Sequence, residues 1–175
     1  MEQEFGGRNK HIKRLQPRRI AEIEAAKTLS SAQRSKLLHF LQVEAPHYIN
    51  GSSRLTHFDL AHNHIYLSRA TGVLKMSGII DWGEAMLGLP EWDVAYLWFW
   101  TFSRDREAVR QCLQTLYADR PIPNQFARRC LAAVLYTSSM SLLWPYFSEQ
   151  ESLCPSIVAE MIEFFFPPDM FGSSD

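Results

Sequence analysis

The sequence is short of cysteine and of net charge, and both shortages exclude whole classes of protein. Three cysteines, Cys112, Cys130 and Cys154, are spread over 175 residues. An odd, widely spaced set predicts neither a disulfide framework nor a zinc site, and it favours a reducing cytoplasm. A formal net charge of -1 at pH 7 argues against bulk electrostatic binding to nucleic acid, which requires a surplus of basic side chains.

Long apolar runs are missing as well. The richest window, residues 94–102, is far shorter than the roughly 20 apolar residues that span a bilayer, so it predicts a buried helix. The first residues have no apolar run of the kind found in secretory signals. We therefore expect a cytoplasmic protein with no membrane partner and no nucleic-acid partner.

Positive charge is concentrated at the start of the chain. We interpret residues 1–19 as a basic, partly flexible terminus, with contact to an anionic partner as the less favoured alternative. Residues 20–175 are expected to form one domain, since 46% of the chain is hydrophobic and 13% is aromatic. The basic side chains of the terminus are Arg8, Lys10, Lys13, Arg14, Arg18 and Arg19.

Apolar periodicity and turn residues predict a mainly helical domain with one small β-hairpin. The hairpin joins β-prone runs at residues 65–67 and 73–80 across Ala70, Thr71 and Gly72, and these are the only strands that we expect. Helices are expected over residues 17–29, 30–41, 90–100, 104–117, 123–143 and 156–166, with a break in the helical pattern at Pro46, Asn50 and Gly51.

Two segments that flank the hairpin carry the residues suited to chemistry: HFDLAHNH at 57–64 and GIIDWGE at 78–84. Phosphoryl transfer needs a carboxylate that accepts the proton of the attacking hydroxyl, plus ligands that hold magnesium against nucleotide phosphates. Asp59 suits the first task, and His64 with Asp81 suits the second. The two ends of an antiparallel hairpin lie side by side, so we expect these residues to share one site.

These segments resemble the catalytic and metal-binding loops of the aminoglycoside phosphotransferase family, which has a protein-kinase-like fold. The family pattern has His and Asp two apart, a metal ligand five residues after that Asp, and a hairpin that ends in Ile-Asp-Trp or Ile-Asp-Phe. His57, Asp59, His64 and the run Ile80-Asp81-Trp82 occupy those places. The resemblance implies that Asp59 is catalytic and that His64 and Asp81 bind Mg²⁺, with ATP as phosphoryl donor and a small-molecule hydroxyl as acceptor.

Two positions depart from the commonest form of the pattern. Most of the family has Asn where this chain has His64, although magnesium generally prefers oxygen ligands. An Asn-His pair, here Asn63-His64, occurs in the branch that phosphorylates the 2''-hydroxyl of aminoglycosides, and macrolide phosphotransferases also have His there. Phe58 stands where the family often has Gly or another small or polar residue.

Further residues are given supporting roles. We expect His57 to brace the catalytic loop rather than to act as an acid or base. The run GLPEWD at 88–93 resembles the family segment Gly-x-Pro-x-x-Asp, so Asp93 is assigned structural support of the loop, with helix capping as its physical basis. Asn63 and Glu84 are accessory candidates, although a surface loop is the commoner setting for such a glutamate.

The resemblance is specific over residues 55–96 and implies the C-terminal lobe of a protein-kinase-like fold. No Gly-rich loop and no strand lysine of the nucleotide-binding lobe is recognisable. We therefore expect a fragment, a truncated gene product or a degenerate relative, with a missing or separate nucleotide lobe as partner. Two alternatives stay open: a non-catalytic binding or regulatory module, and a metal-binding protein that uses His57, His62 and His64.

Overall fold

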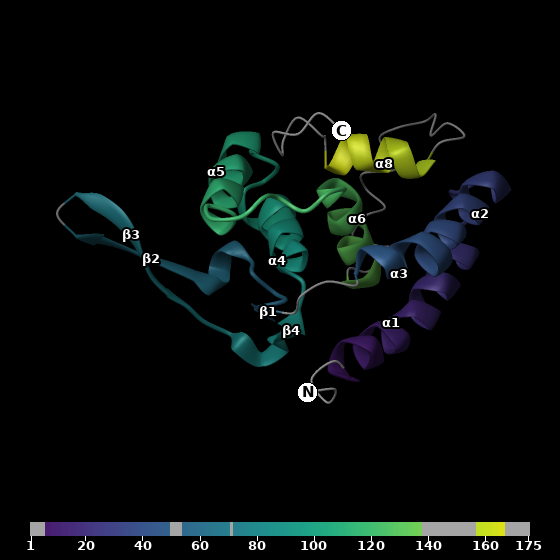
Figure 1. The fold of residues 1–175 in the computed structure, drawn as a ribbon, viewed down its shortest axis with the longest axis horizontal. Coiled ribbons are helices and arrows are strands. Elements are labelled where there is room, and N and C mark those ends of the chain that lie inside the picture. Colours follow the sequence, from purple (N-terminus) through teal and green to yellow (C-terminus); the bar gives the residue numbers. More distant parts are fainter. Residues whose placement is uncertain (1–5, 50–53, 71, 138–156, 167–175) are drawn as a thin grey trace. The chain divides into compact units, whose positions relative to one another are not determined.

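The computed structural model describes residues 6–49, 54–70, 72–137 and 157–166 (Figure 1). Its Cα positions group into two compact units, Met1–Ser52 with Ile122–Asp175, and Ser53–Pro121. Helices predominate, as the sequence predicts, and each described strand belongs to a two-stranded antiparallel sheet. Among the described residues, every helix is too short or too polar to cross a membrane.

The first unit is entirely helical in its described part. The helix predicted from residue 17 begins eleven residues earlier, at Gly6, and continues through Pro17 and the expected boundary at residue 20. A proline is tolerated there because α1 packs against α2 and α6, which compensates for the backbone hydrogen bond that proline cannot make. The elements are α1 (Gly6–Ala25), α2 (Ser31–His39), the π-helical η1 (Phe40–Glu44), α3 (Ala45–Tyr48), α6 (Phe126–Thr137) and α8 (Ile157–Phe165).

Ser30 caps the start of α2. Ser30 adopts an extended backbone, its hydroxyl accepts a hydrogen bond from the Gln33 amide, and the Gln33 side chain accepts one from the Ser30 amide. This reciprocal pair satisfies two amides that the first helical turn leaves without partners. The predicted break at Pro46 is wrong: Pro46 lies in the first turn of α3, and η1 runs directly into that helix.

Tyr136 links α6 to the π-helical η1. Its hydroxyl donates a 2.7 Å hydrogen bond to the carbonyl of Leu41, and burial raises the pKa of Tyr136 to about 12. Arg19, only 3% exposed, places Nε 3.4 Å from the carbonyl of Tyr136 and pairs with Glu22 at 2.7 Å. The largest fully buried side chains of the unit are Ile23, Leu37, Phe40, Leu41, Leu131, Tyr136 and Phe166.

The second unit contains all described strands. Its hairpin, β2 (Ile65–Ala70) with β3 (Val73–Ile79), confirms the prediction and projects from the rest of the unit (Figure 1). Ile65 pairs with Ile79 at its base, and the register shifts between Tyr66 and Leu67. The remaining elements are β1 (Arg54–Thr56), η2 (His62–His64), η3 (Trp82–Glu84), β4 (Met86–Gly88), α4 (Pro90–Tyr96), the π-helical η4 (Leu97–Thr101) and α5 (Arg106–Leu116).

The expectation of a single hairpin as the only β-structure is wrong, because β1 pairs with β4. Each strand has three residues, which is too short for alternation to stand out in the sequence. Gly88 makes the packing behind this ladder possible, since a Cβ there would lie 2.6 Å from Cε3 of Trp92 and 2.7 Å from Oγ1 of Thr56. The ladder thus places the residues after Thr56 directly beside α4.

The later helices differ from prediction mainly at their ends. The helix expected from residue 104 begins at Arg106, because the Asp105 carboxylate caps it by accepting hydrogen bonds from the amides of Glu107 and Ala108. The helix expected from residue 123 begins at Phe126. Its predicted continuation over 138–143, and Cys154, lie outside the described residues; Cys112 and Cys130 are free thiols.

Candidate functional site

The loop that carries Asp59 begins with a tight anchor to α4. The Asp93 carboxylate accepts hydrogen bonds from the His57 amide at 2.9 Å, through Oδ2, and from the Phe58 amide at 2.8 Å, through Oδ1. The capping explanation for Asp93 is wrong, since Leu89 is the residue that precedes α4 and it makes no side-chain cap. Asp93 therefore satisfies amides of the loop, not amides of its own helix.

Asp93 is in an unfavourable place for a charge. Burial, the largest effect, raises the pKa of Asp93, while the hydrogen bonds from the His57 and Phe58 amides and the nearby His57 ring lower it. The net shift is upward, so desolvation outweighs the donated hydrogen bonds. The Asp93 carboxyl group holds the loop in place because its two acceptor oxygens face two consecutive backbone amides.

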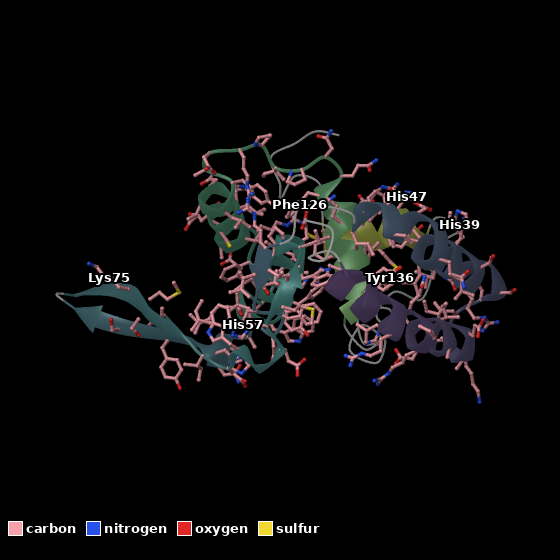
Figure 2. All side chains as sticks on the ribbon, turned by 60° about the horizontal axis from the view of Figure 1, so that its bottom comes forward. His39, His47, His57, Lys75, Phe126 and Tyr136 are labelled. Atoms are coloured by element: carbon pink, nitrogen blue, oxygen red, sulfur yellow. The ribbon has the colours of Figure 1, made fainter. Side chains whose placement is uncertain are left out.

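His57 ties the loop to the segment that follows the hairpin. Its Nε2 lies 2.7 Å from the carbonyl of Ile80, and because a carbonyl only accepts, Nε2 must carry the hydrogen. The ring is buried, and its centroid lies 4.7 Å from the ring of Trp82. In Figure 2 His57 lies at the base of the hairpin, whereas Lys75 lies toward its far end.

His64 lies between the two predicted carboxylates. Its Nδ1 is 2.7 Å from the carbonyl of Asp59 and 3.8 Å from the Asp59 carboxylate, and its Nε2 is 3.6 Å from Oδ2 of Asp81. The bond to a carbonyl places the hydrogen of the neutral ring on Nδ1, so Nε2 presents a lone pair toward Asp81. The structure thus brings Asp59, His64 and Asp81 together around one imidazole.

Asp81 is presented by an unusual backbone. It has φ 62° and ψ 57°, a left-handed conformation that aspartate tolerates better than most residues. The Ile80 amide donates a hydrogen bond to the carbonyl of His64 at 3.0 Å, which holds the two ends of the hairpin together. The Asp81 side chain is 64% exposed and that of Asp59 is 43% exposed, so both carboxylates are accessible from solvent.

The two accessory candidates lie nearby in sequence but do not join this cluster. Asn63 and Glu84 are exposed, in η2 and η3. Within the described ranges neither side chain makes a hydrogen bond to Asp59, His64 or Asp81, and no three His, Cys, Asp or Glu side chains are grouped to hold a metal ion. A metal here would have two protein side chains and would need its other ligands from substrate or water.

The structure adds two contacts that the sequence did not reveal. The Thr101 hydroxyl donates a 3.0 Å hydrogen bond to the carbonyl of Leu60, and Nδ1 of His62 lies 3.2 Å from the carbonyl of Trp100. Both come from η4 and reach the loop after Asp59. A threonine at the end of an aromatic run gives no sequence signal for such a role, because the contact depends on how the helix turns.

The aromatic run in α4 and η4 is divided between interior and surface. Trp92, Trp98 and Phe99 are buried, as expected for core residues at helical spacing. Tyr96 and Trp100 are half-buried, and their ring centroids lie 4.6 Å apart. Most of the aromatic run therefore packs in the interior of the second unit, which also carries the loop.

Comparison with known proteins agrees with the resemblance in the two loops. The model of the family described as the Phosphotransferase enzyme family, APH, matches residues 4–132, well over half of the chain. Neither a curated protein nor a solved structure matches the chain significantly. The family match includes the segment with Asp59, His64 and Asp81, and it implies phosphotransferase activity in general. The chain therefore belongs to the phosphotransferase enzyme family.

Proposed function

We propose that the chain is the C-terminal lobe of a protein-kinase-like enzyme that transfers the γ-phosphoryl group of ATP to a hydroxyl of a small molecule. The observation that carries the proposal is the placing of His64 between the Asp59 and Asp81 carboxylates, 3.8 Å and 3.6 Å from its two ring nitrogens. Aminoglycoside and macrolide acceptors suit the branches that Asn63-His64 resembles, and amino alcohols are a third candidate class of acceptor.

Asp59 is the proton acceptor in this proposal. The acceptor oxygen attacks the γ-phosphorus, the bond from that phosphorus to the ADP oxygen breaks, and the hydroxyl proton passes to the Asp59 carboxylate. The backbone around Asp59 is held by neighbouring hydrogen bonds, while its side chain remains 43% exposed. A fixed backbone with an accessible carboxylate is what proton acceptance from a bound substrate requires.

His64 and Asp81 fit a divalent cation. With Nδ1–H committed to the Asp59 carbonyl, the Nε2 lone pair and Oδ2 of Asp81 are two acceptors that face each other across 3.6 Å. Two ligands at about 2.1 Å from one metal are about 3.0 to 3.4 Å apart, so a small movement of the exposed Asp81 side chain is sufficient. A bound Mg²⁺ would neutralise the phosphate charge, and phosphate oxygens and water would complete its ligands.

The test is a phosphoryl-transfer assay on the complete gene product with radiolabelled ATP, Mg²⁺ or Mn²⁺, and one probe of each class: gentamicin, erythromycin and ethanolamine. Transfer to at least one probe is expected, and Asp59→Asn should lower its rate by about 10²-fold to 10⁴-fold. Asp119→Asn, an exposed acid of the same unit, is the matched control. No transfer to any probe, or an Asp59→Asn variant as active as the control, would refute the proposal.

A further inference from the structure

One continuous helical stretch, α4 followed by η4, contacts the Asp59 loop on both sides of Asp59. Before it, the Phe58 amide donates to Oδ1 of Asp93 at 2.8 Å. After it, the Thr101 hydroxyl donates to the carbonyl of Leu60 at 3.0 Å. The two residues next to Asp59 are thus each anchored to the same helical stretch.

The π-helical turn explains how one helix makes both contacts. Asp93 and Thr101 are eight residues apart, which in a regular α-helix would turn their side chains about 80° away from each other. From Leu97 onward the helix is π-helical, and the Phe102 amide donates to the carbonyl of Leu97 at 2.7 Å. A turn that takes in an extra residue rotates Thr101 back toward the side of Asp93.

The same turn supplies a second contact to the loop. The carbonyl of Trp100 lies 3.2 Å from Nδ1 of His62, and since a carbonyl only accepts, Nδ1 is the donor. His62 is exposed, so this contact competes with water. The bond from Thr101 is partly buried and is the stronger constraint on the loop.

The hydrogen bonds of Phe58 and Leu60 restrict the backbone torsions of Asp59, which lies between them. Its carbonyl accepts hydrogen bonds from the Ala61 amide at 2.9 Å and from Nδ1 of His64 at 2.7 Å. With Phe58 held from one side and Leu60 from the other, the Cα–Cβ direction of Asp59 is set by the loop. The carboxylate can then rotate only about its own side-chain bonds.

We propose that Thr101, presented by the π-helical turn of η4, is a positioning residue that fixes the backbone after Asp59 and thereby aims its carboxylate. The effect on turnover rests on the proposed phosphotransferase function, whereas the effect on the loop does not. Thr101 itself touches neither substrate nor phosphate in this proposal. It acts through the Leu60 carbonyl.

The variants are Thr101→Val, which keeps the shape but removes the donor, and Thr101→Ser, which keeps the hydroxyl. Thr101→Ala removes the donor without a second methyl, in case the valine crowds the loop. Thr115→Val is the matched control, because the Thr115 hydroxyl donates to the Gln111 carbonyl at 3.0 Å on α5 of the same unit. All four are made in the full chain.

The first readout is hydrogen exchange at the Ala61 amide, measured by NMR. Loss of the hydroxyl in the valine or alanine variant should speed this exchange about fivefold or more, because the net contribution of one hydrogen bond to local stability is lost. Exchange in Thr101→Ser and Thr115→Val should stay within about twofold of the wild type. An unchanged Ala61 amide in the valine and alanine variants, or equal acceleration in the serine variant, overturns the proposal.

The second readout is steady-state phosphoryl transfer. Removing the hydroxyl should lower kcat by about 10-fold to 100-fold while the KM for ATP stays within about twofold, since a misplaced group costs turnover and not nucleotide binding. An active enzyme whose kcat is insensitive to Thr101→Val also overturns the proposal. If the wild type transfers no phosphate but Ala61 responds as expected, the proposed function fails while the placement of the loop by Thr101 stands.

Discussion

Phe58 donates its amide hydrogen to Oδ1 of Asp93 across 2.8 Å, and it does so from a left-handed backbone with φ 71°. That conformation strains a residue with a Cβ, at a cost of about 1 to 2 kcal/mol. The Phe58 ring is 8% exposed and packs edge-on against Trp92 with centroids 4.7 Å apart. Burial of the ring offsets the backbone strain, so the loop holds its turn without a glycine.

The balance between strain and ring packing can be measured with two substitutions at Phe58. Phe58→Ala should destabilise the protein by about 3 to 5 kcal/mol through loss of the buried ring. Phe58→Gly loses the same ring but relieves the strain, so it should be more stable than Phe58→Ala by roughly 0.5 to 1 kcal/mol. Urea unfolding of both variants tests this order, and an alanine variant that is the more stable of the two would show that the left-handed turn stores no strain.

Asp93 has a pH dependence whose sign follows from its burial. Because burial raises the pKa of Asp93 above its ordinary value of 3.8, the folded state holds the proton more tightly than the unfolded state. Between pH 3.8 and the raised pKa, the folded state binds more protons than the unfolded state, so the free energy of unfolding falls as the pH rises. Above the raised pKa, the effect of Asp93 on the free energy of unfolding is constant.

Asp93→Asn removes the titration and leaves one of two buried amides facing an NH₂ group, which costs about 1 to 3 kcal/mol. The test measures the free energy of unfolding of wild type and Asp93→Asn in urea at several pH values. The difference between the two should shrink as the pH rises from 3.8 to the raised pKa of Asp93. A difference that grows with pH would mean that the amides of His57 and Phe58 outweigh desolvation.

The sequence predicts those features whose signals are local. The Ser30 cap depends on residues three apart, and the hairpin depends on two β-prone runs with a glycine turn, so both are visible without tertiary information. The meeting of His64 with Asp81 follows from the hairpin alone. The sequence therefore predicts the part of the candidate site that lies at the two ends of the hairpin.

Features set by tertiary packing were not predicted. The β1 and β4 strands are three residues long and pair across 30 to 34 positions, and Thr101 reaches the loop only because η4 is π-helical. Asp93 was assigned to support of the loop from its family resemblance, but with helix capping as the physical basis, whereas its carboxylate accepts hydrogen bonds from the loop amides of His57 and Phe58. In each case the feature depends on how two distant segments pack together, and local propensity does not predict that packing.

Gly88 and Gly78 form a matched pair for testing the ladder behind the loop. A Cβ on Gly88 would lie 2.6 Å from the Trp92 ring, whereas one on Gly78 meets nothing within 4 Å. Gly88→Ala should therefore cost about 1 to 3 kcal/mol by overpacking, and Gly78→Ala should be neutral or slightly stabilising. Thermal unfolding of both variants checks this, and equal melting temperatures would argue against close packing of β4 on α4.

Ser30 offers an independent check on the helical unit. Ser30→Ala removes the acceptor for the Gln33 amide and should cost about 1 kcal/mol. Ser31→Ala is the control, because Ser31 is the exposed first residue of α2 and alanine suits a helix at least as well. The two variants are compared by urea unfolding, and a Ser31→Ala variant as destabilised as Ser30→Ala would rule out a specific capping box.

His64 should leave a signature in metal preference. An imidazole nitrogen suits Mn²⁺ better than Mg²⁺, which strongly prefers oxygen, so the site formed by His64 and Asp81 should favour Mn²⁺. His64→Asn offers an amide oxygen in its place and should lower the ratio of the Mg²⁺ to the Mn²⁺ dissociation constant by on the order of tenfold. Mn²⁺ binding followed by electron paramagnetic resonance, with Mg²⁺ as competitor, measures both constants.

The control for this prediction is His47→Asn, which removes an exposed histidine of α3. Its Mn²⁺ affinity should match that of the wild type, while Asp81→Asn should weaken both metals because it removes the carboxylate and still tolerates the left-handed backbone. A His64→Asn variant with an unchanged metal ratio would mean that Nε2 does not bind the ion.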